Sequence, residues 1–513
     1  MKKYLALILG VLFVLSFAAS AFAIHAEIPS ETQAVVAKGT TQITLGGEIR
    51  VRGWWKDNLA AANDLTIHLY PYNGVSYFYD PDLEFYWSSR YMPWNTDISS
   101  SHYDIAYGGP TPGATLFGGA TATYDAHKHS YYDQRVRLSI DAQISPNVQG
   151  YVQLESNSGT TDTWTWGSSD FNKKPTDLHI LQAWILYKGS GLFGFPAGLK
   201  IGHMPLALSE KQFFDHTKFG DDAVVFFMDP TKDLHIGLLT IKAVEGSTRD
   251  NTDDADVYVA LTTYKLANVG TLGANYTYVN WPDAALSFQN LGLHSNGKVA
   301  GLTYKAELDI QFGKIFDGTT SEAKFRGLGF MAGLGYEINP VNIRAAFGYG
   351  TGDDDPFDNK VKEFQTVLGN DIHYSFVYEY MVSSSAFNQI ISQASGSGIS
   401  TDGRATGLAN TTYYNLGVDY SPMKDLKLSL DGFILRASKI PDGLDMSKTI
   451  GWEVDARASY QIAKNLNYSI IAGYFQPGKF YDPGSWISPE EADSLSVDKK
   501  GVPAFMHALT LSF

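Results

Sequence analysis

The chain has 513 residues, of which 14% are aromatic, and its mean hydropathy is −0.15. Its formal net charge of −15 argues against nucleic acid as a partner. It has no cysteine, which excludes disulfides, iron–sulfur clusters and c-type haem. Many aromatic residues at near-neutral hydropathy are typical of strands that have one face toward lipid and one toward water.

The first residues have the pattern of an export signal. Lys2 and Lys3 precede an apolar run over residues 4–17, and the cleavage motif Ala21-Phe22-Ala23 follows. This order predicts a signal peptide over residues 1–23 and a periplasmic lead-in over residues 24–41. No later stretch approaches 18 uncharged apolar residues, so we expect no transmembrane helix.

The first strand is predicted over residues 42–55, because apolar and polar residues alternate there. Ile49 and Val51 fall on one face, and Arg50 and Arg52 fall on the other. Residues 56–130 then form a connection far beyond ordinary loop length. The same alternation returns in strands predicted at 132–144 and 148–156.

The rest of the chain continues as two-faced strands. They are predicted at residues 178–188, 199–204, 222–228, 234–244, 256–265, 270–281, 287–294, 299–313, 324–337, 341–350, 412–421, 426–435, 449–461, 466–475 and 504–513. Asn296-Gly297 predicts a tight hairpin turn at 295–298. Short connections alternate with long ones, of which 56–130, 351–411 and 476–503 are the longest.

This pattern predicts an all-β fold, a transmembrane antiparallel β-barrel of about 18 strands with long extracellular loops and short periplasmic turns. A barrel in lipid has to pair its last strand with its first, because no strand edge can stay open there. The last strand ends on Phe513, which looks like the insertion signal of bacterial outer-membrane barrels. A barrel of this kind is expected to have the barrel assembly machinery, outer-membrane lipid and lipopolysaccharide as partners.

Charged residues occupy the face opposite the apolar one. Lys305, Glu307 and Asp309 alternate with Leu308 and Ile310, for example. An unpaired charge in a dry core would cost several kcal/mol, so this face predicts a water-filled lumen. The expected pore-lining residues are Glu48, Arg50, Arg52, Arg135, Arg137, Asp141, Glu155, Lys305, Glu307, Asp309, Arg344, Asp419, Glu453, Asp455 and Arg457.

Two charge arrangements fit this set. In one, the arginines of the first two strands form a basic wall that faces an acidic wall, and the resulting field orients polar solutes. In the other, the charges form self-neutralising pairs in a generic hydrated lumen. The sequence leaves both arrangements open and favours the second.

One acidic cluster has the chemistry of a cation site. Asp353, Asp355 and Asp358 offer hard oxygen ligands in a loop that starts Gly-Thr-Gly, so Ca²⁺ is a candidate ligand. The spacing does not match an EF-hand loop. The alternatives are a solvated acidic loop, or a contact with lipopolysaccharide through shared divalent ions.

Three stretches resemble the alginate-export-like family of outer-membrane porins. They are residues 182–184 with 199–206 and 214–215, residues 304–307 with 311–313, and residues 350–355 with Asp358, Lys360 and Phe364. The resemblance implies an 18-stranded barrel with a channel function. The family typically has Gly-Arg-Gln where this chain has Gly202-His203-Met204, so we carry over the fold and the channel but not alginate.

The leading function is therefore passive diffusion of small hydrophilic solutes through the outer membrane of a Gram-negative-type envelope. One alternative is a selective channel or exporter for an anionic or sugar-like solute or a polysaccharide. Another is a structural or adhesive barrel, or the sleeve of a multi-protein complex. An enzyme is not expected, since Gly-x-Ser-x-Gly and His-Glu-x-x-His motifs are absent from the sequence. The solute, the pore width and the oligomeric state stay open.

Overall fold

The computed structural model of the chain describes eighteen stretches of sequence. They are residues 34–38, 41–57, 66–72, 75–80, 85–88, 120–123, 129–157, 164–167, 177–189, 194–246, 254–282, 285–316, 322–355, 358–366, 374–379, 407–440, 447–481 and 501–513. The predicted signal peptide lies outside these residues, as does much of the predicted loop 56–130.

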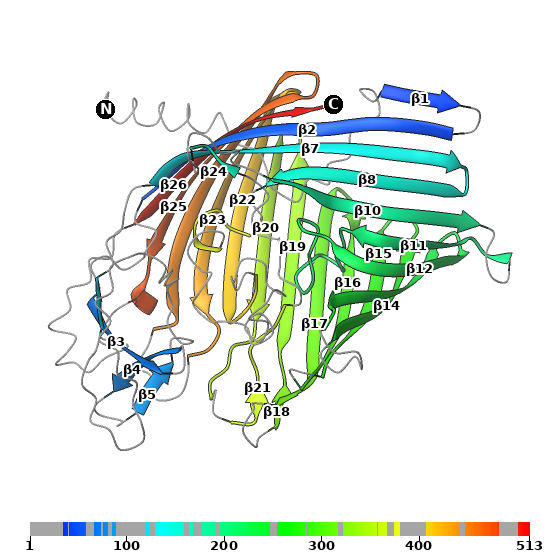
Figure 1. Ribbon diagram of the computed structural model, residues 1–513. Helices are drawn as coiled ribbons and strands as arrows, with labels where there is room; N and C mark the ends of the chain where they lie inside the picture. The colour runs from blue at the N-terminus through cyan, green and yellow to red at the C-terminus, as the bar shows by residue number, and fades with distance from the viewer. Residues whose placement is uncertain are drawn as a thin grey trace, which may run out of the picture.

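Eighteen antiparallel strands form a closed barrel within the described residues, which confirms the predicted fold (Figure 1). The strands are β2 (Thr41–Lys56), β7 (His129–Ser145), β8 (Val148–Asn157), β10 (Asp177–Gly189), β11 (Ala197–Met204), β12 (Asp221–Thr231), β13 (Leu234–Val244), β14 (Ala255–Leu266), β15 (Gly270–Trp281), β16 (Leu286–Val299), β17 (Leu302–Phe316), β19 (Leu328–Ile338), β20 (Val341–Gly350), β22 (Thr411–Met423), β23 (Leu426–Ala437), β24 (Thr449–Ala463), β25 (Leu466–Pro477) and β26 (Val502–Ser512). Each pairs with its neighbours in chain order.

The barrel closes where β26 pairs with β2. Residue 513 continues this pairing, because the backbone N–H of Gly47 donates to the Phe513 carbonyl at 2.6 Å and the Phe513 N–H donates back at 3.0 Å. The Phe513 ring covers Gly47 so closely that a Cβ there would lie 2.6 Å from it. Beyond that point the short strand β1 (Ala34–Lys38) pairs with β2, beside the C-terminus in Figure 1.

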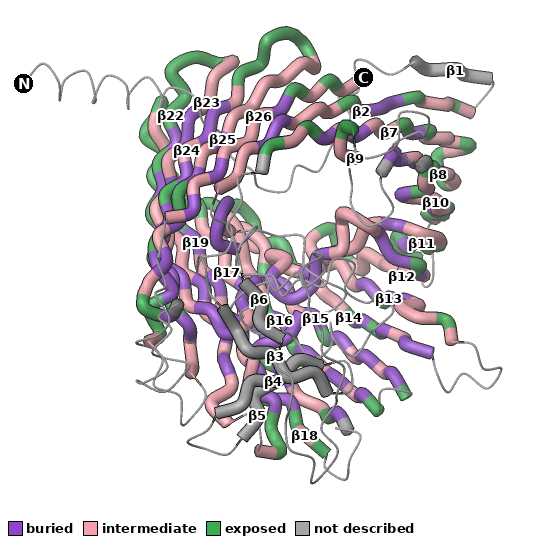
Figure 2. The backbone as a smooth tube through the Cα atoms, turned by 60° about the vertical axis from the view of Figure 1, so that its left-hand side comes forward, coloured by how far each residue is buried: buried purple, intermediate pink, exposed green. Residues whose placement is uncertain are grey.

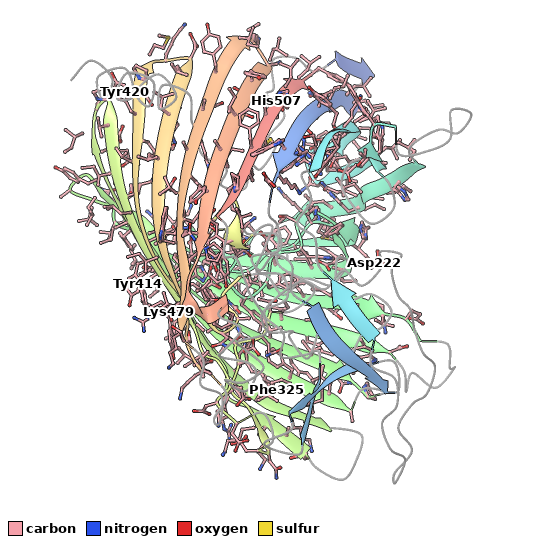
Figure 3. The ribbon with its side chains drawn as sticks, turned by 90° about the vertical axis from the view of Figure 1, so that its left-hand side faces the viewer. Asp222, Phe325, Tyr414, Tyr420, Lys479 and His507 are labelled. Carbon is pink, nitrogen blue, oxygen red and sulfur yellow. The ribbon has the colours of Figure 1, made fainter. Side chains whose placement is uncertain are left out.

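The wall of the barrel has two chemically different faces. In β17, Ile310 is exposed on the outside, while Glu307 and Asp309 are buried on the inside. Figure 2 shows the resulting alternation of buried and exposed residues along the strands. Tyr414 and Tyr420 lie at two heights on the outer side in Figure 3, and both are about half exposed. An apolar and aromatic outer face is what a lipid surround requires.

Two boundary predictions were wrong. β16 runs through the predicted turn at 295–298, and the chain reverses instead at Ala300 and Gly301, which have φ angles of 50° and 86°. Asn296 stays in the strand because it pairs with Thr271 on β15 and Lys305 on β17. The strand predicted at 324–337 is two strands, β18 (Glu322–Phe325) and β19, and β18 pairs in parallel with β21 (Lys360–Val361).

Smaller elements lie at the long-loop end and beside the wall. β3 (Thr66–Tyr72), β4 (Val75–Asp80), β5 (Phe85–Ser88) and β6 (Ala120–Thr123) form a four-stranded sheet. β9 (Trp164–Thr165) pairs with β7, and a short 3₁₀ helix, η5 (Lys479–Tyr481), follows β25. Among the helices of the described residues, none is long and apolar enough to cross a membrane.

Candidate functional site: the inner face of the barrel

A short hairpin folds from the long-loop end against the inner wall. It comprises residues 205–220, between the eight-residue strand β11 and β12, and we call it the inner hairpin. Ala207 bridges to Asp215, and the Leu208 N–H donates to the Phe214 carbonyl at 3.0 Å. Phe213 is fully buried, and its ring stacks on Phe288 of β16 at 6.1 Å. Apolar burial therefore holds the hairpin against the wall.

The tip of the inner hairpin is fixed by hydrogen bonds to three strands. Ser209 Oγ lies 2.9 Å from His294 Nδ1 and accepts a hydrogen bond from Asn275 at 2.7 Å. Glu210 accepts from the Asn296 side chain at 2.6 Å. The backbone N–H of Gln212 donates to Glu307 at 3.2 Å. The tip therefore sits over β15, β16 and β17.

A second segment, residues 374–379, docks against the inner face of β24 and β25, and we call it the inner turn. Glu453 accepts hydrogen bonds from the backbone N–H groups of Val377 at 2.6 Å and Tyr378 at 2.7 Å. Asp455 accepts from the Phe376 N–H at 3.0 Å. The Phe376 ring stacks on Trp54 of β2 at 6.1 Å. Inward carboxylates thus act as anchors for a folded segment.

This anchoring changes the interpretation of four residues predicted to line the pore. Glu307, Asp309, Glu453 and Asp455 lie on the inner face, but each is at most 1% exposed. Alternating charge predicts a polar surrounding for the inner face. It does not distinguish lumen water from backbone N–H groups that a folded segment supplies. These four residues are therefore covered rather than bathed in lumen water.

The arginines of β2 and β7 form ion pairs along one wall. Arg52 binds Asp133 through two hydrogen bonds of 2.7 and 2.8 Å. Arg135 contacts Glu48 at 2.6 Å. Arg137 on β7 binds Glu155, the residue directly opposite it on β8, at 2.6 Å. Arg50 stands directly across from Arg135, and Asp141 accepts two hydrogen bonds from Gln149 at 2.9 Å.

A second paired network lies on β20, β22 and β23. Arg344 contacts both Asp419 and Asp431 at 3.0 Å, and Lys427 lies 3.5 Å from Asp419. Arg457 on β24 contacts Asp455 at 3.4 Å. Lys305 also lies on the inner face, next to Glu307 along β17.

Sequence reasoning missed Asp133 and Asp431. Both occupy inward positions of predicted strands, and their alternation was the signal that could have revealed them.

The positive member of most of these pairs is the more exposed one. The side chain of Arg137 is 14% exposed and that of Glu155 only 2%. Arg344 is 20% exposed, against 7% for Asp419 and 5% for Asp431. Because the acids lie against the wall and the guanidinium groups project past them, the wall is locally neutral but presents positive charge to the lumen.

The acidic loop places a lysine among the predicted calcium ligands. The Lys362 ammonium lies 3.9 Å from Asp353, 2.5 Å from Asp354 and 3.1 Å from Asp358. Asp355 donates its backbone N–H to Asp353 at 3.1 Å. Hydrogen bonds from Lys362, and then from Lys439, lower the pKa of Asp354. Calcium binding here stays a prediction, and Lys362 is the cation that competes with it.

A family model described as alginate export matches residues 120–381. Similar solved structures include three Pseudomonas aeruginosa proteins. OccK11 (OpdR) shares 11% identity at a TM-score of 0.46, and the alignment covers 91% of this chain and 96% of that one. OccK8 (OprE) shares 11% and OccK1 (OpdK) 9%, at TM-scores of 0.45 and 0.47, each over 91% of this chain and 98% of the other. Among curated proteins, none matches the chain.

Proposed function

The chain belongs to the alginate export family and is a β-barrel of the bacterial outer membrane, and from this premise we propose that it is a passive channel for small hydrophilic solutes with a weak preference for anions. Long strands with an apolar outer face span the bilayer, and the charged inner face supports water and polar solutes. The two inner segments narrow the space inside the barrel and set which solutes fit.

The pairing of charges on the inner face is the observation that carries this proposal. Arg52, Arg135 and Arg137 each contact a carboxylate on a neighbouring strand. Paired charges keep the lumen polar without creating a deep electrostatic well, so a solute that enters also leaves. The more exposed guanidinium groups supply the weak anion preference.

Liposome swelling tests the proposal. Vesicles that contain the refolded barrel are diluted into isotonic sugars of increasing size, and then into a sugar acid of matched size. We expect swelling rates that fall with sugar size and are higher for the acid. In the variant Glu155→Gln, which leaves Arg137 without its carboxylate, the acid should enter faster still. A folded barrel that supports no swelling with any sugar would contradict the proposal.

A second candidate is an exporter of an anionic polysaccharide. The projecting guanidinium groups favour it, because a row of exposed cations can follow a row of carboxylates. The family model is described as alginate export, and alginate is an anionic polysaccharide. If the barrel is such an exporter, oligomers of a sugar acid should block the ionic current at low concentration, and neutral oligomers of equal length should not. Equal block by both would favour the passive channel.

A further inference from the structure

A row of basic side chains crosses three strands at the long-loop end of the barrel. Lys314 on β17 pairs with Lys324 on β18, and Lys324 pairs with Lys360 on β21. The Arg326 N–H donates to the Val361 carbonyl at 2.8 Å, so the pairing continues and Arg326 shares the face of Lys324. Figure 1 shows β18 and β21 at the end of the barrel away from the C-terminus. We call Lys314, Lys324, Arg326 and Lys360 the basic row.

The basic row faces outward. On the opposite side of β18 and β21, Phe325 pairs with Val361, and both side chains are buried. Because side chains alternate between the two faces of a strand, Lys324 and Lys360 point away from this buried side. The side chains of Lys314 and Lys360 are 57% and 54% exposed. The ammonium groups are therefore accessible from outside the barrel.

The basic row lies just beyond the lipid-facing band. The outward residues of β17 are apolar from Leu302 to Phe312, and the next outward residue is Lys314. About ten residue steps of about 3.3 Å, along a strand tilted by about 40°, cover about 25 Å, which is the usual height of the apolar band. Leu302 follows the short turn at Gly301, and short turns lie on the periplasmic side. Lys314 is therefore at the headgroup level of the outer leaflet.

The basic row has an excess of positive charge. Two of its members have a carboxylate partner, since Lys314 contacts Glu322 at 2.7 Å and Lys360 contacts Asp358 at 3.0 Å. The other two members form no ion pair with a described residue. The carboxylate of Asp354, in the neighbouring acidic loop, is held by lysines outside the basic row. The basic row therefore carries two more positive charges than the carboxylates that contact it.

This excess is local. Strand pairing leads from Lys314 through β16 and β15 to Asp256 on β14 and Lys242 on β13, at the same level of the outer face. There the charges are balanced in favour of acids, because Lys242 contacts Asp256 at 2.8 Å and Asp254 at 2.9 Å. An anionic partner at the headgroup level would thus prefer β17, β18 and β21.

We propose that the basic row binds the phosphate groups of lipopolysaccharide in the outer leaflet. The lipid anchor of lipopolysaccharide carries its phosphates on the sugars directly above the acyl chains, which is the level of the basic row. Neighbouring strands are about 4.8 Å apart, so one phosphate can accept charge-assisted hydrogen bonds from two adjacent lysines. Basic clusters at a membrane surface bind anionic headgroups in this way. The contact is the same whichever solute the channel carries.

Native mass spectrometry tests the proposal. The refolded barrel in detergent is titrated with diphosphorylated lipid A, the lipid anchor of lipopolysaccharide. The unmodified chain should bind it. The triple variant Lys314→Gln, Lys324→Gln and Lys360→Gln should bind roughly 100-fold more weakly, because each lysine near an anionic lipid surface contributes a factor of about five. These side chains are exposed, so the heat-dependent shift on gels should stay unchanged.

A matched control removes the same charge from the short-turn end. The exposed lysines there are replaced in Lys265→Gln, Lys298→Gln and Lys424→Gln, and this variant should bind lipid A like the unmodified chain. Equal binding by the unmodified chain and the basic-row variant would overturn the proposal.

A comparison of lipids needs no variant. Lipid A without phosphates should bind the unmodified chain far more weakly than diphosphorylated lipid A, and equal binding of the two would also overturn the proposal. Binding of diphosphorylated lipid A should persist in a chelator, because ammonium groups make the contact. Loss of binding in the chelator would assign the contact to divalent ions, and the basic row would then not be the site.

Discussion

At the scale of single residues, the inner face depends on arginines that hold more than one carboxylate. Arg344 bridges Asp419 on β22 and Asp431 on β23, and both acids are almost fully buried. A buried carboxylate that loses its cation keeps the cost of desolvation without the attraction that offsets it. The stability of this wall therefore depends on the pairing, although the pairing adds little net charge.

Replacing Arg344 tests this dependence. Arg344→Gln should lower the free energy of unfolding by about 3–5 kcal/mol, because Asp431 and Asp419 stay buried and lose their guanidinium. Adding Asp431→Asn should recover part of the loss. Urea unfolding in detergent micelles, followed by tryptophan fluorescence, measures both. The exposed Lys265→Gln serves as the control and should unfold like the unmodified chain. A double variant no more stable than Arg344→Gln would refute the charge argument.

The acidic loop gives a prediction for the effect of pH. Lys362 and Lys439 lower the pKa of Asp354 in the folded loop. This carboxylate therefore stabilises the loop fully at pH values above about 4, the pKa of an Asp in the unfolded chain. The stabilisation is lost as the pH falls through the lower folded value. Because the chain has no cysteine, Asn359→Cys allows a single spin label in the loop.

The mobility of that label should rise as the pH is lowered from 5 toward 2. In the Asp354→Asn background the label should already be mobile at pH 7 and respond less to acid. Electron paramagnetic resonance spectra across this range measure the effect. Identical pH profiles in the two backgrounds would show that Asp354 does not hold the loop.

At the scale of elements, alternation predicted every barrel strand, but it did not predict the inner hairpin. Period-two patterns report which face of a strand is apolar, and lipid imposes that requirement directly. The hairpin depends instead on contacts between residues far apart in sequence, such as Phe213 with Phe288. Two adjacent phenylalanines in a connection between strands, Phe213 and Phe214, were the signal that could have revealed it. Asn-Gly at 296–297 predicted a turn where the structure has a continuous strand, because pairing with the strands on both sides outweighs the local turn preference.

The closing pair of strands depends on a glycine. Gly47→Val should displace the Phe513 ring and impair closure, because a Cβ at Gly47 would lie 2.6 Å from that ring. Less of the protein should then show the folded, heat-sensitive band after refolding into vesicles. Gly150→Val is the matched control, since a Cβ there meets nothing within 4 Å. Equal folded fractions for the two variants would contradict this role of Gly47.

The inner hairpin should narrow the channel. Phe213→Ala removes a fully buried ring and should weaken the docking by about 3–5 kcal/mol. Single-channel current should become larger or noisier as the hairpin leaves the wall. Phe226→Ala, on the outer register of β12, should leave the current unchanged. If Phe213→Ala and Phe226→Ala gave the same steady current, the hairpin would not limit conduction.

At the scale of the whole molecule, the barrel combines an acidic chain with a nearly neutral inner wall. The −15 total gives no information about the lumen, since the wall of β2, β7 and β8 balances Arg50, Arg52, Arg135 and Arg137 against Glu48, Asp133, Asp141 and Glu155. The strand number, the closure and the facing of the charged residues followed from the sequence. The sequence did not predict that the inner hairpin and the inner turn cover the acidic pairs on β17 and β24. That coverage depends on where the connections between strands fold, and strand periodicity contains no information about the fold of connections.

Reversal potential in a planar bilayer tests the central claim most directly. The refolded barrel is inserted between two salt solutions of different concentration, and the voltage at zero current is read. We predict steady single-channel steps. We also predict a small reversal potential whose sign shows that anions permeate somewhat better than cations. That potential should grow in Glu155→Gln, which removes the carboxylate that the guanidinium of Arg137 contacts. A correctly folded barrel that passes no current, or one with strong cation selectivity, would contradict the account.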